Sequence, residues 1–299
     1  MQRFRLDKKR IWKNLIAVLI ICTFMLQGCG REKNTVAESQ AQMQAEDVAP
    51  ASDTTLTITA IKAGDADAFV LIAGEHVTII DTGLDKKADR LLDFLDEQGV
   101  SRVDELIITH FDKDHVGGAD HVIDNYEVGK VYTTYQSKDS DDITAYREAL
   151  EAKGLTETVV TKKTTFNVED ISFTIYPPEA DSYVSKTSNN SSLVIKVSLG
   201  NSSMLFTGDA EEERIEELLR TEGLKSTILK VPHHGRLALN SAKLFDYIAP
   251  RYAIISSGSN SNDDEDVLKL LEKKGITTYL TKNGNITITM KADKVYITQ

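Results

Sequence analysis

The stretch Thr109-His110-Phe111-Asp112-Lys113-Asp114-His115-Val116-Gly117-Gly118 carries four imidazole and carboxylate side chains within six residues. It directly follows an apolar run at 105–109 that is typical of a strand. Imidazole and carboxylate groups are the ligands that many divalent metals take, and the two glycines allow a sharp turn. The stretch therefore predicts a metal centre at a strand end. The alternative is a polar helix cap in which Asp114 caps the next helix.

Three further segments place an acid or a histidine pair at a strand end. They are Ile79-Ile80-Asp81-Thr82-Gly83, Leu205-Phe206-Thr207-Gly208-Asp209 and Val231-Pro232-His233-His234-Gly235. Each has an ordinary explanation when taken alone, since Asp209 suits a helix N-cap and paired loop histidines are often surface residues. One shared site explains four such strand ends better than four separate caps.

Short β-branched runs alternate with helical patterns from residue 55 to the end of the chain. Strands are predicted at 56–61, 68–73, 76–80, 105–109, 130–135, 158–161, 171–176, 193–198, 203–207, 227–231, 252–256, 277–280, 286–290 and 295–298. Helices are predicted at 86–98, 142–152, 211–221, 238–248 and 264–274. This order predicts an α+β domain at 55–299 with two sheets faced by helices.

The four segments, in this order, resemble the metallo-β-lactamase superfamily. Its HxHxDH motif is similar to residues 110–115, with Asp112 in place of the middle histidine. Segments 110–118, 190–194, 207–209 and 233–235 resemble the HxDxDHxGG, NxSLV, TGD and HHG segments of the extracellular hydrolase domain of ComEC-type competence proteins. The resemblance covers 55–299 and implies a four-layer αββα sandwich with metals at its open edge.

The resemblance implies two metal sites of unequal quality. The second-metal set is complete, with Asp114, His115, Asp209 and a final histidine that is His234 or His233, of which His234 is preferred. The first-metal set has His110, Asp112 and the shared Asp209, but its third histidine is absent. Asn190 stands at that position and offers only a weak amide oxygen, and His121 is expected on a helix surface. Asp81 is expected to orient a ligand histidine by a hydrogen bond.

The implied chemistry is hydrolysis by a metal-bound hydroxide, with Asp114 and Asp209 as catalytic residues. Zinc suits the complete site, and manganese is credible at the oxygen-rich one. Arg236 is a candidate phosphate contact. The preferred function is a phosphodiesterase that acts on nucleic acid or on an envelope phosphodiester. The alternatives are an ester, thioester or lactam hydrolase of the same fold, and a non-catalytic binding module stabilised by metal.

The charge of the chain is unevenly distributed. The 299 residues include 35 Lys and Arg against 46 Asp and Glu, a net charge of −11. The first 28 residues hold six basic side chains and one acid, so the remainder carries 29 basic and 45 acidic residues, a net charge of −16. This balance argues against a broad basic face, so we expect no stable nucleic-acid complex. Nothing in the sequence indicates the oligomeric state.

The N-terminus resembles a bacterial lipoprotein signal. Residues 15–26 form an uncharged run of 12 residues, which suits a signal peptide and falls short of the roughly 20 residues of a membrane span. Leu26-Gln27-Gly28-Cys29 follows and resembles a lipobox. We therefore expect a signal at 1–28, a lipidated Cys29, a flexible tether at 29–54 and a membrane-anchored protein outside the cytoplasm. The alternative is an uncleaved N-terminal anchor.

Overall fold

The computed structural model describes residues 53–258 and 265–299. The predicted signal, Cys29 and the predicted tether up to residue 52 lie outside the described residues. Within the described ranges, no helix is both long enough and apolar enough to cross a membrane.

The strands in these ranges form two sheets. The first contains β1 (Leu56–Ala60), β2 (Ala68–Ala73), β3 (His76–Thr82), β4 (Arg102–Ile108), β5 (Glu127–Thr133), β6 (Glu157–Val159), β14 (Ile286–Lys291) and β15 (Lys294–Thr298), in the order β15-β14-β1-β2-β3-β4-β5-β6. The second contains β7 (Thr164–Val168), β8 (Ile171–Tyr176), β9 (Val194–Leu199), β10 (Ser202–Phe206), β11 (Ile228–Lys230), β12 (Tyr252–Ile255) and β13 (Thr277–Leu280), in the order β13-β12-β11-β10-β9-β8-β7.

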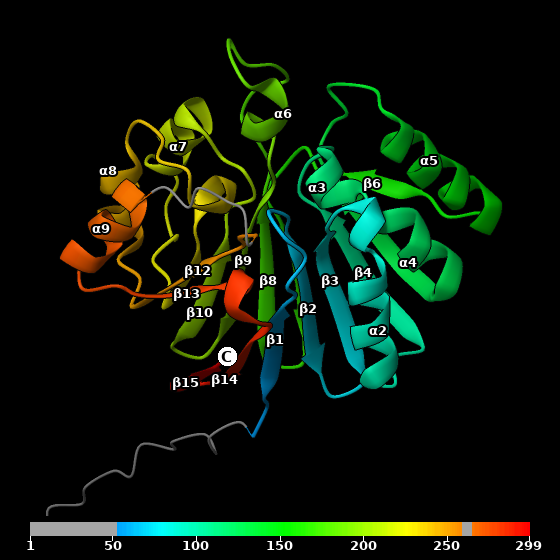
Figure 1. Ribbon diagram of the computed structural model, residues 1–299, viewed down its shortest axis with the longest axis horizontal. Coiled ribbons are helices and arrows are strands. Elements are labelled where there is room, and N and C mark those ends of the chain that lie inside the picture. Colours follow the sequence, from blue (N-terminus) through cyan, green and yellow to red (C-terminus); the bar gives the residue numbers. More distant parts are fainter. Residues whose placement is uncertain (1–52, 259–264) are drawn as a thin grey trace, which may run out of the picture. The chain divides into compact units, whose positions relative to one another are not determined.

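Helices cover the outer faces of both sheets. The α-helices are α2 (Asp89–Glu97), α3 (Lys113–Val116), α4 (Ala119–Asn125), α5 (Asp141–Lys153), α6 (Thr187–Asn190), α7 (Glu212–Leu218), α8 (Ser241–Ile248) and α9 (Glu265–Lys273). Short 3₁₀ turns are η1 (Asp85–Lys87), η2 (Pro232–Gly235) and η3 (Thr281–Asn283). Figure 1 shows α2, α4 and α5 on one side of the sheets and α7, α8 and α9 on the other.

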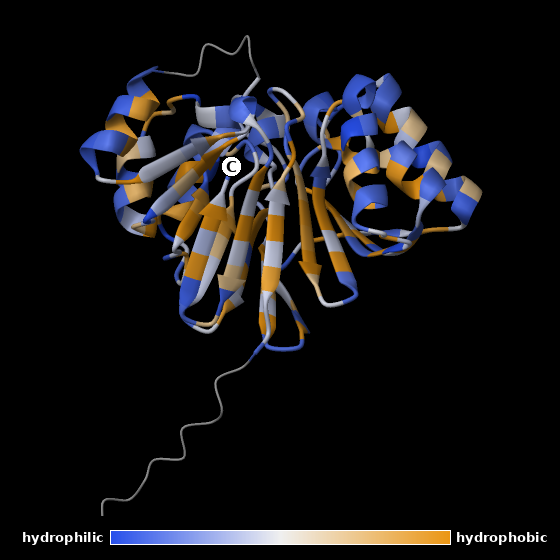
Figure 2. Ribbon diagram, turned by 60° about the horizontal axis from the view of Figure 1, so that its bottom comes forward, coloured by the Kyte–Doolittle hydropathy of each residue, from blue (hydrophilic) through white to orange (hydrophobic). Residues whose placement is uncertain are grey.

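Three hydrophobic cores hold these layers together. The core between the sheets includes Phe69 of β2 and Phe206 of β10, whose ring centroids lie 5.1 Å apart. A second core joins the first sheet to α2, α4 and α5, and a third joins the second sheet to α7, α8 and α9. Adjacent residues of β3, such as Ile79 and Ile80, face different cores because side chains alternate along a strand. Figure 2 shows apolar residues along the length of the strands.

These layers confirm the predicted four-layer αββα sandwich. The main predicted strands and helices are present, with ends shifted by one to a few residues. The predicted helix at 86–98 divides into η1 and α2, and the predictions omitted β7 and the short helices α3, α4 and α6.

Parallel strand pairs in both sheets bring the motif segments to one edge. β3 runs parallel to β4, with Ile80 paired to Ile107, and β10 runs parallel to β11, with Leu205 paired to Leu229. The carboxyl ends of parallel neighbours lie at the same edge, which is where α/β folds place their ligands. In Figure 1 this edge is at the top, beside α3 and α6.

Candidate metal centre

Four of the predicted ligands converge at this edge. One ligand atom from each of Asp114, His115, Asp209 and His234 lies within 4.8 Å of the other three. His234 Nε2 is 3.1 Å from Asp114 Oδ2 and 3.3 Å from Asp209 Oδ2, and His115 Nε2 is 3.2 Å from Asp209 Oδ1. His115, Asp209 and His234 are buried, while Asp114 faces a pocket. The group can therefore surround one cation and leave a side open to a substrate.

Neither carboxylate serves as the helix cap considered above. α3 begins after Asp112, and no side chain caps it. α7 begins after Glu211, two residues beyond Asp209, and the side chain of Asp209 makes no hydrogen bond to the first turn of this helix. The clustering of Asp114 and Asp209 therefore needs an explanation other than helix capping.

Asp81 fixes the orientation of His115. The Nδ1–H of His115 donates to Asp81 Oδ2 at 2.8 Å. The backbone N–H and the hydroxyl of Thr109 also donate to the Asp81 carboxylate, each at 2.7 Å. With its proton held on Nδ1, His115 presents the Nε2 lone pair to the four-residue group, an arrangement that metal-binding histidines commonly use.

Strained backbone conformations also gather here. Asp81, His233 and His234 have φ values of 57°, 46° and 53°, in the left-handed region that residues other than glycine rarely adopt. Such conformations persist only where the surroundings impose them, and they cluster at functional sites. The left-handed turn at His233 and His234 sends the two rings to different neighbours.

Several buried polar atoms in the four-residue group and beside it lack a hydrogen-bond partner. Among the described residues, His110 Nε2, His115 Nε2 and Asp209 Oδ1 are fully buried and make no hydrogen bond. Buried polar groups nearly always have hydrogen-bond partners, so buried nitrogen and oxygen atoms that make no hydrogen bond around one site fit a place that binds a cation. Imidazole nitrogens with carboxylate oxygens are a donor set that zinc accepts. The residues therefore fit the metal that the sequence predicts.

The charges of the group are strongly coupled. Burial would raise the pKa of Asp209, but the His234 and His115 imidazoles hold it well below its usual range. Burial would lower the pKa of His234, but Asp209 and then Asp114 raise it to about 9. Burial would also lower the pKa of His115, but Asp209 and then Asp81 hold it well above its usual range. A cation that binds here would displace protons from these imidazoles.

His110 and Asp112, predicted for the first metal, lie beside this group, but their side chains do not contact each other closely. Burial and the charge of His115 lower the pKa of His110 to about 4, so its imidazole is neutral. Its Nε2 lies 3.9 Å from Asp112 Oδ1. Asp112 instead pairs with Lys138 at 2.5 Å and accepts a hydrogen bond from Ser188. The first site is therefore the less organised of the two.

Asn190, expected to offer at best a weak amide oxygen near the first metal, uses that oxygen elsewhere in the structure. Its Oδ1 accepts from the backbone N–H groups of Glu211 and Arg214, at 3.1 and 3.2 Å. Its Nδ2 donates to the Ser185 carbonyl at 3.0 Å. Asn190 satisfies the first turn of α7, so its amide oxygen is already occupied.

His233 and Arg236 lie at the edge of the group. His233 Nδ1 is 2.9 Å from Glu211 Oε1, and Arg236 Nη1 donates to His233 Nε2 at 2.8 Å. His233 Nε2 is 3.8 Å from Asp209 Oδ2. Of the two adjacent histidines, His234 is therefore the one that joins the four-residue group. His121 lies on α4 and pairs with Asp85 at 2.9 Å, away from this group.

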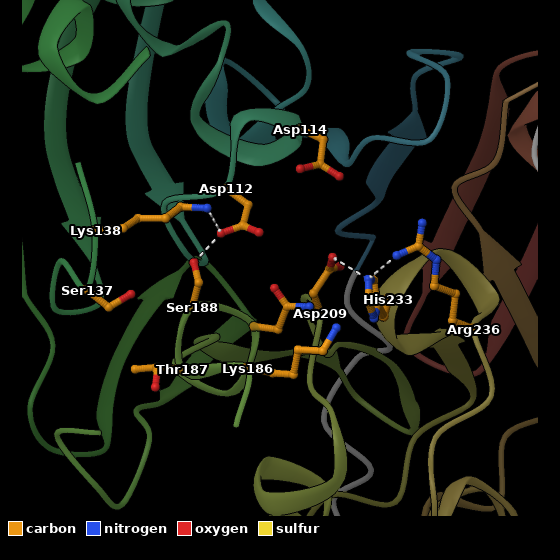
Figure 3. Close-up of a pocket in the computed structure, with 11 residues that line it drawn as sticks. Asp112, Asp114, Ser137, Lys138, Lys186, Thr187, Ser188, Asp209, His233 and Arg236 are labelled. Carbon is orange, nitrogen blue, oxygen red and sulfur yellow. Dashed lines mark hydrogen bonds and ion pairs between the residues drawn. The ribbon is translucent and has the colours of Figure 1, made fainter. Parts of the chain in front are cut away.

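The group opens into a pocket of about 540 Å³. Figure 3 shows Asp112, Asp114 and Asp209 among three cationic side chains, Lys138, Lys186 and Arg236. Ser137, Thr187, Ser188, Asn189 and His233 complete the lining. A pocket that sets acids for a cation beside cations for an anion can hold a metal and a phosphate together.

The sequence predictions missed several of these residues. Lys138 lies in a polar loop, and Lys186 and Ser188 lie at the start of the short helix α6, in stretches that carry no motif. Asp67 and Lys230 are buried beside the four-residue group. Lys230 interrupts the apolar run 228–231 shortly before the histidine pair, and a charged residue in such a run is a signal that sequence analysis could have used.

Comparison with known proteins agrees with this geometry. Residues 61–259 match the Metallo-beta-lactamase superfamily. ComE operon protein 3 of Bacillus subtilis is 32% identical over 205 residues, which cover 66% of this chain and 26% of that protein. Recombination protein 2 of Haemophilus influenzae is 28% identical over 69% of this chain and 25% of its own length. The chain thus spans about a quarter of the length of these relatives.

A solved structure shares the fold. The metallo-beta-lactamase fold protein YhfI from Bacillus subtilis aligns with a TM-score of 0.53 over 82% of this chain and 100% of its own. The sequence identity is 8%, so the likeness concerns the fold alone.

Proposed function

Because the chain belongs to the metallo-β-lactamase superfamily, we propose that it is a metal-dependent hydrolase that cleaves phosphodiesters. The observation that carries the proposal is the pocket in which Asp114 and Asp209 meet Lys138, Lys186 and Arg236. Carboxylates and imidazoles suit a divalent cation, and the three basic side chains suit the oxygens of a phosphoryl group.

The residues proposed to hold the principal metal are Asp114, His115, Asp209 and His234, with zinc as the expected ion. His110, Asp112 and the shared Asp209 would hold a metal more weakly at the first site, where manganese is the alternative. A divalent cation would make water a stronger nucleophile at neutral pH and would offset the negative charge that develops on the phosphoryl oxygens.

The protein's own groups then have separate tasks. Asp114 is the most exposed of the four principal residues, and the charge of its histidine neighbours keeps its pKa below its ordinary value despite burial. It is therefore ionised at neutral pH, and its carboxylate can accept a hydrogen bond from the attacking water. Lys186 and Arg236 at the pocket wall would bind phosphate oxygens, and Lys138 holds Asp112 in place.

Two substrate classes fit the proposal, nucleic acid and an envelope phosphodiester. The name of one relative, Recombination protein 2, supports nucleic acid. The net charge of −16 beyond residue 28 supports brief, local contact through the pocket cations over a stable complex. A lipid anchor at Cys29, which would hold the protein at the membrane outside the cytoplasm, is proposed on the sequence alone.

Turnover of bis(p-nitrophenyl) phosphate by the full chain tests the proposal. We expect activity with zinc or manganese and none after chelation. Asp114→Asn should lower kcat by about 100-fold or more, because it removes a carboxylate beside the nucleophile. His121→Ala, at the surface histidine of α4, serves as the control and should keep wild-type kcat. Metal binding without phosphodiester turnover, together with cleavage of an ester or lactam probe, would contradict the proposal.

A further inference from the structure

A buried charge pair lies behind His234 and has no task in the proposed reaction. Asp67 is 2% exposed and Lys230 is fully buried, and the two side chains form an ion pair. Burying two charges costs desolvation free energy that their attraction often fails to recover. Such a pair is therefore weak evidence for stability alone, and its surroundings indicate another use.

Asp67 faces the rear of His234. Asp67 Oδ1 lies 3.5 Å from His234 Nδ1, and among the described residues both atoms are buried without a hydrogen bond. The opposite nitrogen of the ring, Nε2, faces Asp114 and Asp209. The His234 ring thus stands between one carboxylate behind it and the four-residue group in front.

His115 provides the precedent within the same site. Its Nδ1 donates to Asp81 at 2.8 Å, while its Nε2 faces Asp209 at 3.2 Å. Asp67 Oδ1 faces His234 Nδ1 at 3.5 Å, just as Asp81 Oδ2 faces His115 Nδ1 at 2.8 Å. Each of the two histidines therefore has its own buried carboxylate.

Lys230 holds Asp67 in this position. Its ammonium contacts the other Asp67 oxygen, donates to the Gly208 carbonyl at 2.9 Å and lies 3.5 Å from Asp209 Oδ1. The backbone N–H of Asp67 also donates to the Asp114 carbonyl at 3.0 Å. These contacts connect three segments, namely the residue before β2, the helix α3 and the last residue of β11.

We propose that Asp67 and Lys230 are a positioning pair for the metal centre, in which Asp67 accepts the Nδ1–H of His234 and so orients its Nε2 toward the cation. This inference rests on the metal centre proposed above. A carboxylate in this role typically raises metal affinity by about 10-fold to 100-fold.

Zinc affinity of the full chain, measured by competition with a chelator, tests the pair. Asp67→Asn should weaken zinc binding by about 10-fold to 100-fold. That variant leaves the buried Lys230 ammonium without the negative charge of Asp67. The double variant Asp67→Asn/Lys230→Met therefore removes both charges, so that the net charge of the pair stays at zero. The double variant should show the same loss of affinity. Wild-type affinity in the double variant would overturn the inference.

A matched control separates positioning from simple stability. Arg214 and Glu217 form another buried ion pair, at 2.6 Å on α7. Glu217→Gln should lower the Tm and leave zinc affinity unchanged. If Glu217→Gln weakened zinc binding as much as Asp67→Asn, the inference would be overturned, because loss of any buried pair would then suffice.

A spectroscopic signature adds an independent readout. In the zinc-loaded protein, ¹H NMR should show slowly exchanging imidazole N–H signals from His115 and His234, and Asp67→Asn should remove the His234 signal and keep the His115 signal. Two unchanged signals would count against the pair. If the wild-type chain bound no zinc, the metal centre itself would fail; if it bound zinc and every Asp67 variant bound equally well, only the role of Asp67 would fail.

Discussion

At the scale of single residues, the role of a carboxylate depends on whether its histidine partner is buried in the site. Asp81 and His115 lie 2.8 Å apart and are buried, whereas Asp85 and His121 lie 2.9 Å apart and are exposed. Asp81→Asn should weaken zinc binding by about 10-fold to 100-fold, because an amide no longer fixes the proton on His115 Nδ1. Isothermal titration with zinc measures the change. Asp85→Asn is the matched control, and an equal loss in both variants would show that Asp81 has no special role.

At the scale of elements, helix α7 depends on a side chain from outside its own sequence. Asn190 accepts from two backbone N–H groups at the first turn of α7. Asn190→Ala should lower the free energy of unfolding by about 1 to 2 kcal/mol, because both donors lose their acceptor. Chemical denaturation measures this loss, and zinc affinity should stay unchanged. Ser140→Ala, at the N-cap of α5, gives a comparison for an ordinary cap. Unchanged stability with weaker zinc binding in Asn190→Ala would restore Asn190 as a ligand.

At the scale of the whole molecule, the metal-free protein should lose stability as pH rises. The folded-state pKa of His234 is raised to about 9 from an ordinary 6.5. A raised pKa contributes stability that is present below pH 6.5 and is lost as pH rises toward about 9. Calorimetry should therefore show the Tm of the chelated protein falling across this interval. Zinc should remove much of the fall, since a cation replaces the protons, and His234→Gln should reduce it. A flat metal-free Tm would contradict this coupling.

The sequence reveals those parts of the fold and of the site that local patterns encode. Asp81, Asp114 and Asp209 each come at the end of an apolar run or shortly after it. A strand end that carries a site residue can therefore be recognised from the local sequence alone. The partnership of Asp67 with Lys230 joins the entry to β2 in one sheet with the end of β11 in the other, and no local pattern encodes that meeting. The capping role of Asn190 was missed for the same reason, because the backbone N–H groups that donate to its Oδ1 lie more than 20 residues further along the chain.

The centre draws its residues from both halves of the sandwich, with Asp114 and His115 following β4 and Asp209 and His234 following β10 and β11. A cation bound there would act as a clasp across the open edge of the two sheets, much as a disulfide ties two segments of a chain. Peeling the sheets apart would then require the ion to leave, so the lifetime of the folded chain would follow the supply of metal around it.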